Sequence, residues 1–168
     1  SSIPGCHWPT IQQCRLLQIP RGGAAMYQYG LLAPMTALIA WSLVMLVWLG
    51  AARLPAMRRL GIKPETGKFA GATNAAMPDG PRQVADNYNH LMEQPTIFYA
   101  ICIVLQWLGQ GDHAVNIGFA WGYVVLRVAH SLVQATFNHV PTRFGLFALS
   151  SLLLLGLTLH AIIGMAHH

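Results

Sequence analysis

Three ionisable residues at helical spacing interrupt an apolar stretch of this sequence. Asp86, His90 and Glu93 recur at i, i+4 and i+7, which predicts that they share one face of a helix. Carboxylates next to an imidazole can move a proton or hold an ammonium group. Lipid penalises charged groups strongly, so this face needs partners within the protein, a second subunit or a bound ligand.

A second apolar stretch carries a matching polar stripe. Tyr123, Arg127, His130 and Gln134 are spaced by four, three and four residues, so they also share one helix face. A guanidinium group can bind a carboxylate through two parallel hydrogen bonds. Ionisable residues within membrane segments usually mark a cavity or a binding site, and these two stripes are therefore the candidate functional residues.

The amino-acid composition indicates which class of protein carries these two polar stripes. Of 168 residues, 54% are hydrophobic and only 9% are charged, with a mean hydropathy of +0.44. Soluble domains have about 25% charged residues, so the sequence indicates a membrane protein. The net charge of +5 comes from basic residues scattered through loops, without a basic helix face, which argues against nucleic-acid binding.

Four apolar segments are long enough to cross a bilayer, which takes about 20 residues in a helix. Backbone groups in lipid must be satisfied within the segment, so helices are expected. The sequence therefore predicts an all-α integral membrane protein, a four-helix bundle. The expected spans are residues 27–52, 84–108, 114–136 and 144–166.

Charge distribution predicts the orientation and the domain limits. The loop at 53–83 holds most of the basic residues, so by the positive-inside rule it is cytoplasmic and both termini lie on the opposite side. We interpret residues 1–25 as a flexible N-terminal extension ahead of a membrane domain at 26–168. Three cysteines, without a close-spaced pair, predict no metal site.

The depths of the two stripes suggest how they meet. Glu93 and Arg127 each lie about nine residues from the cytoplasmic end of their spans, or roughly 13 Å at 1.5 Å per residue. We predict a Glu93–Arg127 ion pair. The pair either locks the two helices together structurally or forms part of a ligand site.

Two runs of sequence resemble the MAPEG family, the membrane-associated proteins in eicosanoid and glutathione metabolism. They are NHLMEQPTIFYA (89–100) and RVAHSLVQATFNHVPTR (127–143), and the similarity extends from Met26 to the C-terminus. The resemblance implies a homotrimer of four-helix protomers that binds glutathione between subunits near the cytoplasmic face. It also implies that Glu93 holds the amino end of glutathione, that Arg127 activates the thiol and that Arg143 lines the site.

Other positions of the implied glutathione site depart from the family pattern. His90 stands where the family usually has asparagine, Asn89 and Asp86 replace arginines, and Gln134 replaces a tyrosine. We expect His90, Asn89 and Gln134 to supply hydrogen bonds to glutathione. Asp86 is expected to repel its carboxylates.

Two functions follow from this resemblance. The first is a glutathione-dependent transferase or peroxidase acting on a lipophilic electrophile that enters from the membrane lipid. The alternative is a non-catalytic accessory subunit that packs with other membrane protein subunits of a larger complex. Haem binding by the intramembrane histidines is disfavoured, because His160 lies near the opposite side of the membrane from His90 and His130.

Overall fold

The computed structural model describes residues 29–63, 65 and 71–166. This part of the chain is all-helical, as predicted, and contains five helices rather than the expected four. They are α2 (Leu32–Leu60), α3 (Ala72–Ala75), α4 (Asp79–Trp107), α5 (Ala114–Ala135) and α6 (Val140–Ala166). The predicted extension at 1–25 and two of the three cysteines lie outside the described residues.

The four long helices correspond to the four predicted spans, but three of them extend further than predicted, at the ends that face the 53–83 loop or the α5–α6 turn. α2 continues past residue 52 to Leu60, where Gly61 ends it in a left-handed conformation with φ of 62°. α4 begins at Asp79 and α6 at Val140. A charged residue ends an apolar run without ending the helix, because leucine, alanine, methionine and arginine all favour the helical conformation. A helix can therefore continue beyond its apolar segment. The 53–83 loop is correspondingly shorter than predicted.

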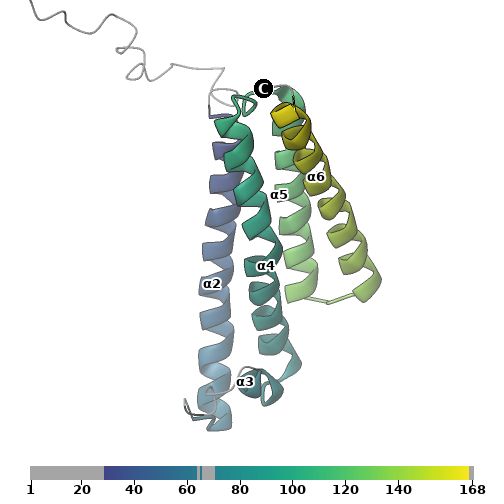
Figure 1. Ribbon diagram of the computed structural model, residues 1–168. Coiled ribbons are helices and arrows are strands. Elements are labelled where there is room, and N and C mark those ends of the chain that lie inside the picture. Colours follow the sequence, from purple (N-terminus) through teal and green to yellow (C-terminus); the bar gives the residue numbers. More distant parts are fainter. Residues whose placement is uncertain (1–28, 64, 66–70, 167–168) are drawn as a thin grey trace, which may run out of the picture.

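The long helices lie side by side, with α4 and α5 at the centre (Figure 1). Each of these two helices contacts all of the other long helices, whereas α2 and α6 flank the pair. The start of α2 and the end of α6 lie at one end of the structure. The α5–α6 turn and the short helix α3 lie toward the other end, where α6 diverges from α5 (Figure 1).

The distribution of polar and apolar side chains is that of a protein surrounded by lipid. The outer surfaces of the helices carry many exposed large apolar residues, such as Leu43, Val47, Leu152 and Ile162. Polar side chains lie inside: Asn87, Asn116, Arg127, His130, Ser131, Gln134 and Ser150 are all buried. Among the described helices, α2 and α6 are long and apolar enough to cross a membrane by length and composition.

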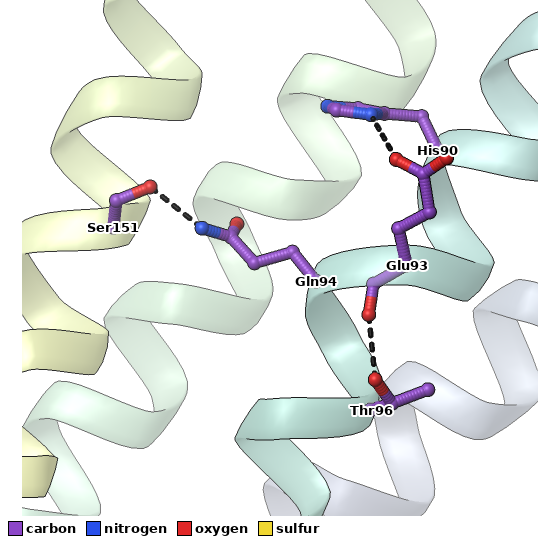
Figure 2. Close-up of polar contacts among 5 residues, drawn as sticks. All are labelled: His90, Glu93, Gln94, Thr96 and Ser151. Carbon is purple, nitrogen blue, oxygen red and sulfur yellow. Dashed lines mark hydrogen bonds and ion pairs between the residues drawn. The ribbon is translucent and has the colours of Figure 1, made fainter.

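Buried hydrogen bonds join the central helices. The Asn87 side-chain amide on α4 donates to Ser131 Oγ on α5 at 2.7 Å. Two turns further along α4, Gln94 Nε2 donates to Ser151 Oγ on α6 at 2.7 Å (Figure 2). Because the surroundings are apolar, each of these side chains would otherwise lack a partner, and the two bonds fix how α4 faces its neighbours.

Glycines allow α5 and α6 to approach closely. A Cβ atom at Gly156 of α6 would lie 2.7 Å from the Phe119 ring, and one at Gly122 of α5 would lie 2.8 Å from Leu153 Cδ1. Both distances are shorter than a van der Waals contact. Small residues at such positions are typical of membrane helix interfaces, where close packing replaces the hydrophobic effect as the source of stability.

A second polar cluster joins α5 and α6 at the opposite end from the α5–α6 turn. Asn116 Oδ1 lies 2.7 Å from His160 Nδ1, and the Asn116 amide donates to the Gln110 carbonyl at 3.0 Å. The Gln110 side chain also packs directly against Gly164 of α6. The α4–α5 connection, the start of α5 and the end of α6 are therefore held together by one set of contacts.

We predict that the Asn87–Ser131 hydrogen bond couples α4 to α5 energetically. In a double-mutant cycle with Asn87→Ala and Ser131→Ala, the coupling energy should be about 0.6–1.7 kcal/mol, the range found for hydrogen bonds between membrane helices. Unfolding of the detergent-solubilised protein measures it. Strictly additive effects of the two substitutions would show that the bond does not contribute to stability.

We also predict that Gly156→Ala destabilises the protein by about 1–3 kcal/mol, because the Phe119 ring must move to admit the methyl group. Gly145→Ala is the matched control on the same helix, since a Cβ there meets nothing within 4 Å. It should be neutral or slightly stabilising through better helix propensity. Equal unfolding temperatures for the two variants would contradict the close packing of α5 and α6.

Candidate functional site

Five residues predicted to bind glutathione line one cavity. This polar cavity, of about 340 Å³, is formed by Asp86, Asn89, His90 and Glu93 of α4, Gln134 of α5 and Arg143 of α6. Its volume lies within the usual range for small-molecule sites. The structure thus brings together Glu93, Arg143, His90, Asn89 and Gln134, and their role in binding stays a prediction.

The α4 wall of the polar cavity is organised by a contact between His90 and Glu93. His90 Nδ1 lies 3.2 Å from Glu93 Oε2, one turn apart on the helix (Figure 2). The side chain of His90 is 32% exposed and that of Glu93 is 71% exposed. The Glu93 carboxylate therefore retains free lone pairs and remains accessible to a ligand from the cavity.

The opposite wall presents a guanidinium group that the α5–α6 turn holds in place. Arg143, in the first turn of α6, donates from Nη1 to Asn138 Oδ1 at 2.9 Å. Asn138 has a φ of 46°, in the left-handed region that asparagine tolerates better than most residues, and its backbone N–H bonds to the Val133 carbonyl. The first turn of α6 contains no acidic residue. Arg143 and the positive end of the helix dipole together favour an anion here.

Glu93 and Arg127, predicted to form an ion pair, are not in contact in this structure. Glu93 instead lies beside His90 on the exposed side of α4, whereas Arg127 points into the interior and is only 1% exposed. The depth calculation placed both residues at the same level but did not fix the rotation of α4. That rotation is set by the buried face of α4, which runs through Asn87, Leu91 and Phe98.

Arg127 is enclosed by aromatic rings instead of carboxylates. Its guanidinium carbon lies 5.7 Å from the centroids of both the Tyr123 and the Phe147 rings. None of its three side-chain nitrogens has a hydrogen-bond partner among the residues that the structure describes. Ring faces attract a cation, but they do not replace the hydrogen bonds that a buried guanidinium requires. Arg127 does not line the polar cavity.

A second, smaller cavity adjoins the polar one. This aromatic cavity, of about 200 Å³, is lined by His90, His130, Val140, Arg143, Phe144 and Phe147. It shares His90 and Arg143 with the polar cavity. The ring of His90 lies 5.3 Å from those of both His130 and Phe147, so the histidine forms part of the boundary between the two cavities.

Sequence reasoning missed the contribution of α6 to the aromatic cavity. Val140, Arg143, Phe144 and Phe147 follow the i, i+3, i+4 and i+7 pattern of one helix face. That pattern was available from the sequence. It was overlooked because the expected span began at residue 144, which left Val140 and Arg143 in a loop.

The family comparison agrees with this architecture. A model of the MAPEG family matches residues 31–163, which is most of the chain. The chain belongs to the MAPEG family. The match includes all four long helices except the last residues of α6, and it covers every residue that lines the two cavities. Neither the curated proteins nor the solved structures contain a match to this chain.

Family membership and the inside-out distribution of polarity identify a membrane protein. The described residues contain no group of three or more histidine, cysteine, aspartate or glutamate side chains arranged to hold a metal ion. The rings of His90 and His130 lie 5.3 Å apart and are tilted by 37°, and His160 bonds to Asn116 at the other end of α5. The candidate site is therefore the pair of cavities between α4, α5 and α6.

We predict that Arg127→Met leaves the fold intact and raises its stability by at least about 1 kcal/mol. Methionine fills a similar volume and removes a buried charge that has no hydrogen-bond partner among the described residues. Thermal unfolding in detergent measures the change, with Arg59→Met on the exposed end of α2 as the control. Marked destabilisation would show instead that Arg127 has a partner outside the described residues.

Proposed function

We propose that this MAPEG-family protein binds glutathione in the polar cavity and joins it, through its sulfur, to lipophilic electrophiles. The observation that carries the proposal is the placement of Glu93 of α4 and Arg143 of α6 in the lining of one cavity of about 340 Å³. Glutathione has an ammonium group that a carboxylate can hold and carboxylates that a guanidinium can hold. The two walls offer these groups in one site.

The adjoining aromatic cavity suits the second substrate. Phe144 is 69% exposed, so a lipophilic molecule in the surrounding lipid has an apolar contact at the rim of this cavity. Arg143 lines both cavities and is therefore the guanidinium best placed to touch a thiolate that points toward the electrophile. Arg127, predicted from the sequence to activate the thiol, acts in this proposal at longer range through its charge.

The proposed reaction is a nucleophilic displacement or addition. The glutathione thiol releases its proton, and the thiolate sulfur forms a bond to an electrophilic carbon while a leaving group departs or a double bond accepts the electron pair. Arg143 favours the charged thiolate over the thiol, which increases the fraction of the reactive form at neutral pH. Reduction of a lipid hydroperoxide by glutathione is the other reaction open to the same thiolate.

We further propose that the four long helices all cross the membrane, with the loop between α2 and α4 in the cytoplasm and both termini on the other side. α4 and α5 carry more polar residues than α2 and α6, but these side chains are directed largely to the interior or to the cavities. The two cavities then lie near the cytoplasmic face. We also propose assembly as a homotrimer with glutathione bound between subunits, as the family resemblance implies.

The second proposed function is that of a non-catalytic accessory subunit in a larger membrane complex. One observation favours it: Asp86 contributes a second carboxylate to the cavity, and Arg127 lies outside it. A site that no longer binds glutathione would leave the polar residues to hold helices and subunits together. This function predicts a folded protein that does not bind the thiol.

Calorimetry on the detergent-purified protein tests these two functions. We expect glutathione to bind, and we expect Arg143→Gln and Glu93→Gln each to weaken binding at least about tenfold, the equivalent of one hydrogen bond to a charged group. Arg59→Gln is the control for loss of an exposed positive charge. Binding that is insensitive to both site variants would place glutathione elsewhere, and no binding by folded wild type would favour the accessory function.

A further inference from the structure

The polar cavity carries more negative charge than a glutathione site requires. Its α4 wall holds two carboxylates, Asp86 and Glu93, whose side chains are 48% and 71% exposed. The facing wall holds a single guanidinium, that of Arg143, and the remaining polar groups on the lining are His90, Asn89 and Gln134. His90 is already in contact with Glu93.

The carboxylate of Asp86 is held in position by the segment before α4. Asn74, on the four-residue helix α3, donates from Nδ2 to Asp86 Oδ1 at 2.9 Å. Arg82 Nε lies 3.9 Å from Asp86 Oδ2, and both of these side chains are about half exposed. An ion pair this long and this exposed is weak, and Arg82 does not line the cavity. The cavity therefore retains a fixed negative charge at its α3 end.

The distance between Asp86 and Glu93 along α4 indicates which part of a glutathione-like ligand would lie beside the Asp86 carboxylate. Asp86 and Glu93 are seven residues apart on α4, or about 10 Å along the helix axis. A tripeptide in an extended conformation spans about 10 Å. With its amino end at Glu93, a tripeptide thiol lying along α4 places its C-terminal group beside Asp86. In glutathione that group is the glycine carboxylate, and two like charges would then face each other.

We propose that the polar cavity selects a tripeptide thiol whose C-terminal carboxylate is replaced by an uncharged or positively charged group, such as an amide, and that Asp86 makes this selection. The proposal rests on the function proposed above and narrows its substrate class. Asp86 acts as a specificity-determining residue: it repels the free carboxylate and accepts a hydrogen bond from an amide or an ammonium group.

Calorimetry with two thiols that differ only at this group tests the selection. Glutathione and glutathione amide are titrated separately into the detergent-purified full chain. We expect wild type to bind the amide at least about fivefold more tightly, because a charge of the same sign is removed from a half-exposed site. Raising the salt concentration should reduce the difference by screening.

Asp86→Asn tests whether Asp86 causes the preference. Asparagine keeps the Oδ1 acceptor for Asn74 and removes only the charge, so this variant should bind the two thiols about equally. Asp79→Asn is the matched control, because Asp79 is an exposed residue at the start of α4 that does not line the cavity. It should retain the preference of wild type. Thermal unfolding verifies that each variant is folded.

The possible results separate this proposal from the function on which it rests. Equal affinities of wild type for the two thiols, or tighter binding of glutathione, would overturn the selection by Asp86 while leaving the thiol site in place. The same comparison on wild type decides the matter if Asp86→Asn does not fold. Failure of folded wild type to bind either thiol would overturn the thiol site itself.

Discussion

Polar side chains in an apolar bundle must face inward and find partners there, and the packing of this protein depends on that constraint. Asn87 and Ser131 satisfy each other across the α4–α5 interface, and Gln94 finds Ser151 on α6. These bonds set the rotation of α4 relative to its neighbours. Once α4 is rotated in this way, His90 and Glu93 fall beside α6 and the exterior, and the polar cavity opens between them and Arg143.

Much of the fold follows from periodicity in the sequence. The 3.6-residue repeat placed Tyr123, Arg127, His130 and Gln134 on one face of α5, and all four are buried. Apolar length and composition identified four helices in the correct order. The ends of the helices were less predictable, because a charged residue stops an apolar run without stopping a helix. The end of α2 is determined by Gly61 and not by the first arginine.

The residues that line the polar cavity were predictable from the sequence, whereas Val140, Phe144 and Phe147 of the aromatic cavity and the contacts between helices were missed. Periodicity fixes the phase of residues within one helix, whereas an ion pair between helices depends on how each helix is rotated. Packing decides that rotation. Phe98 stacks on Tyr123 with ring centroids 4.4 Å apart, which buries the face of α4 that bears Asn87 and turns Glu93 outward. No pattern within α4 alone carries this information.

A polar cluster joins α5 and α6 at the end of the bundle away from the α5–α6 turn. His160, bonded to Asn116, lies seventeen residues from Arg143 along α6, or about 25 Å. The helices are joined tightly at the His160 end and diverge toward Arg143 (Figure 1). Between these two ends, Gln94 of α4 holds Ser151 of α6, eight residues from Arg143. The part of α6 that lines the two cavities lies beyond this hydrogen bond, and the α5–α6 turn tethers it through Arg143 and Asn138. The width of both cavities therefore depends on the hydrogen bonds at the two ends of this short segment.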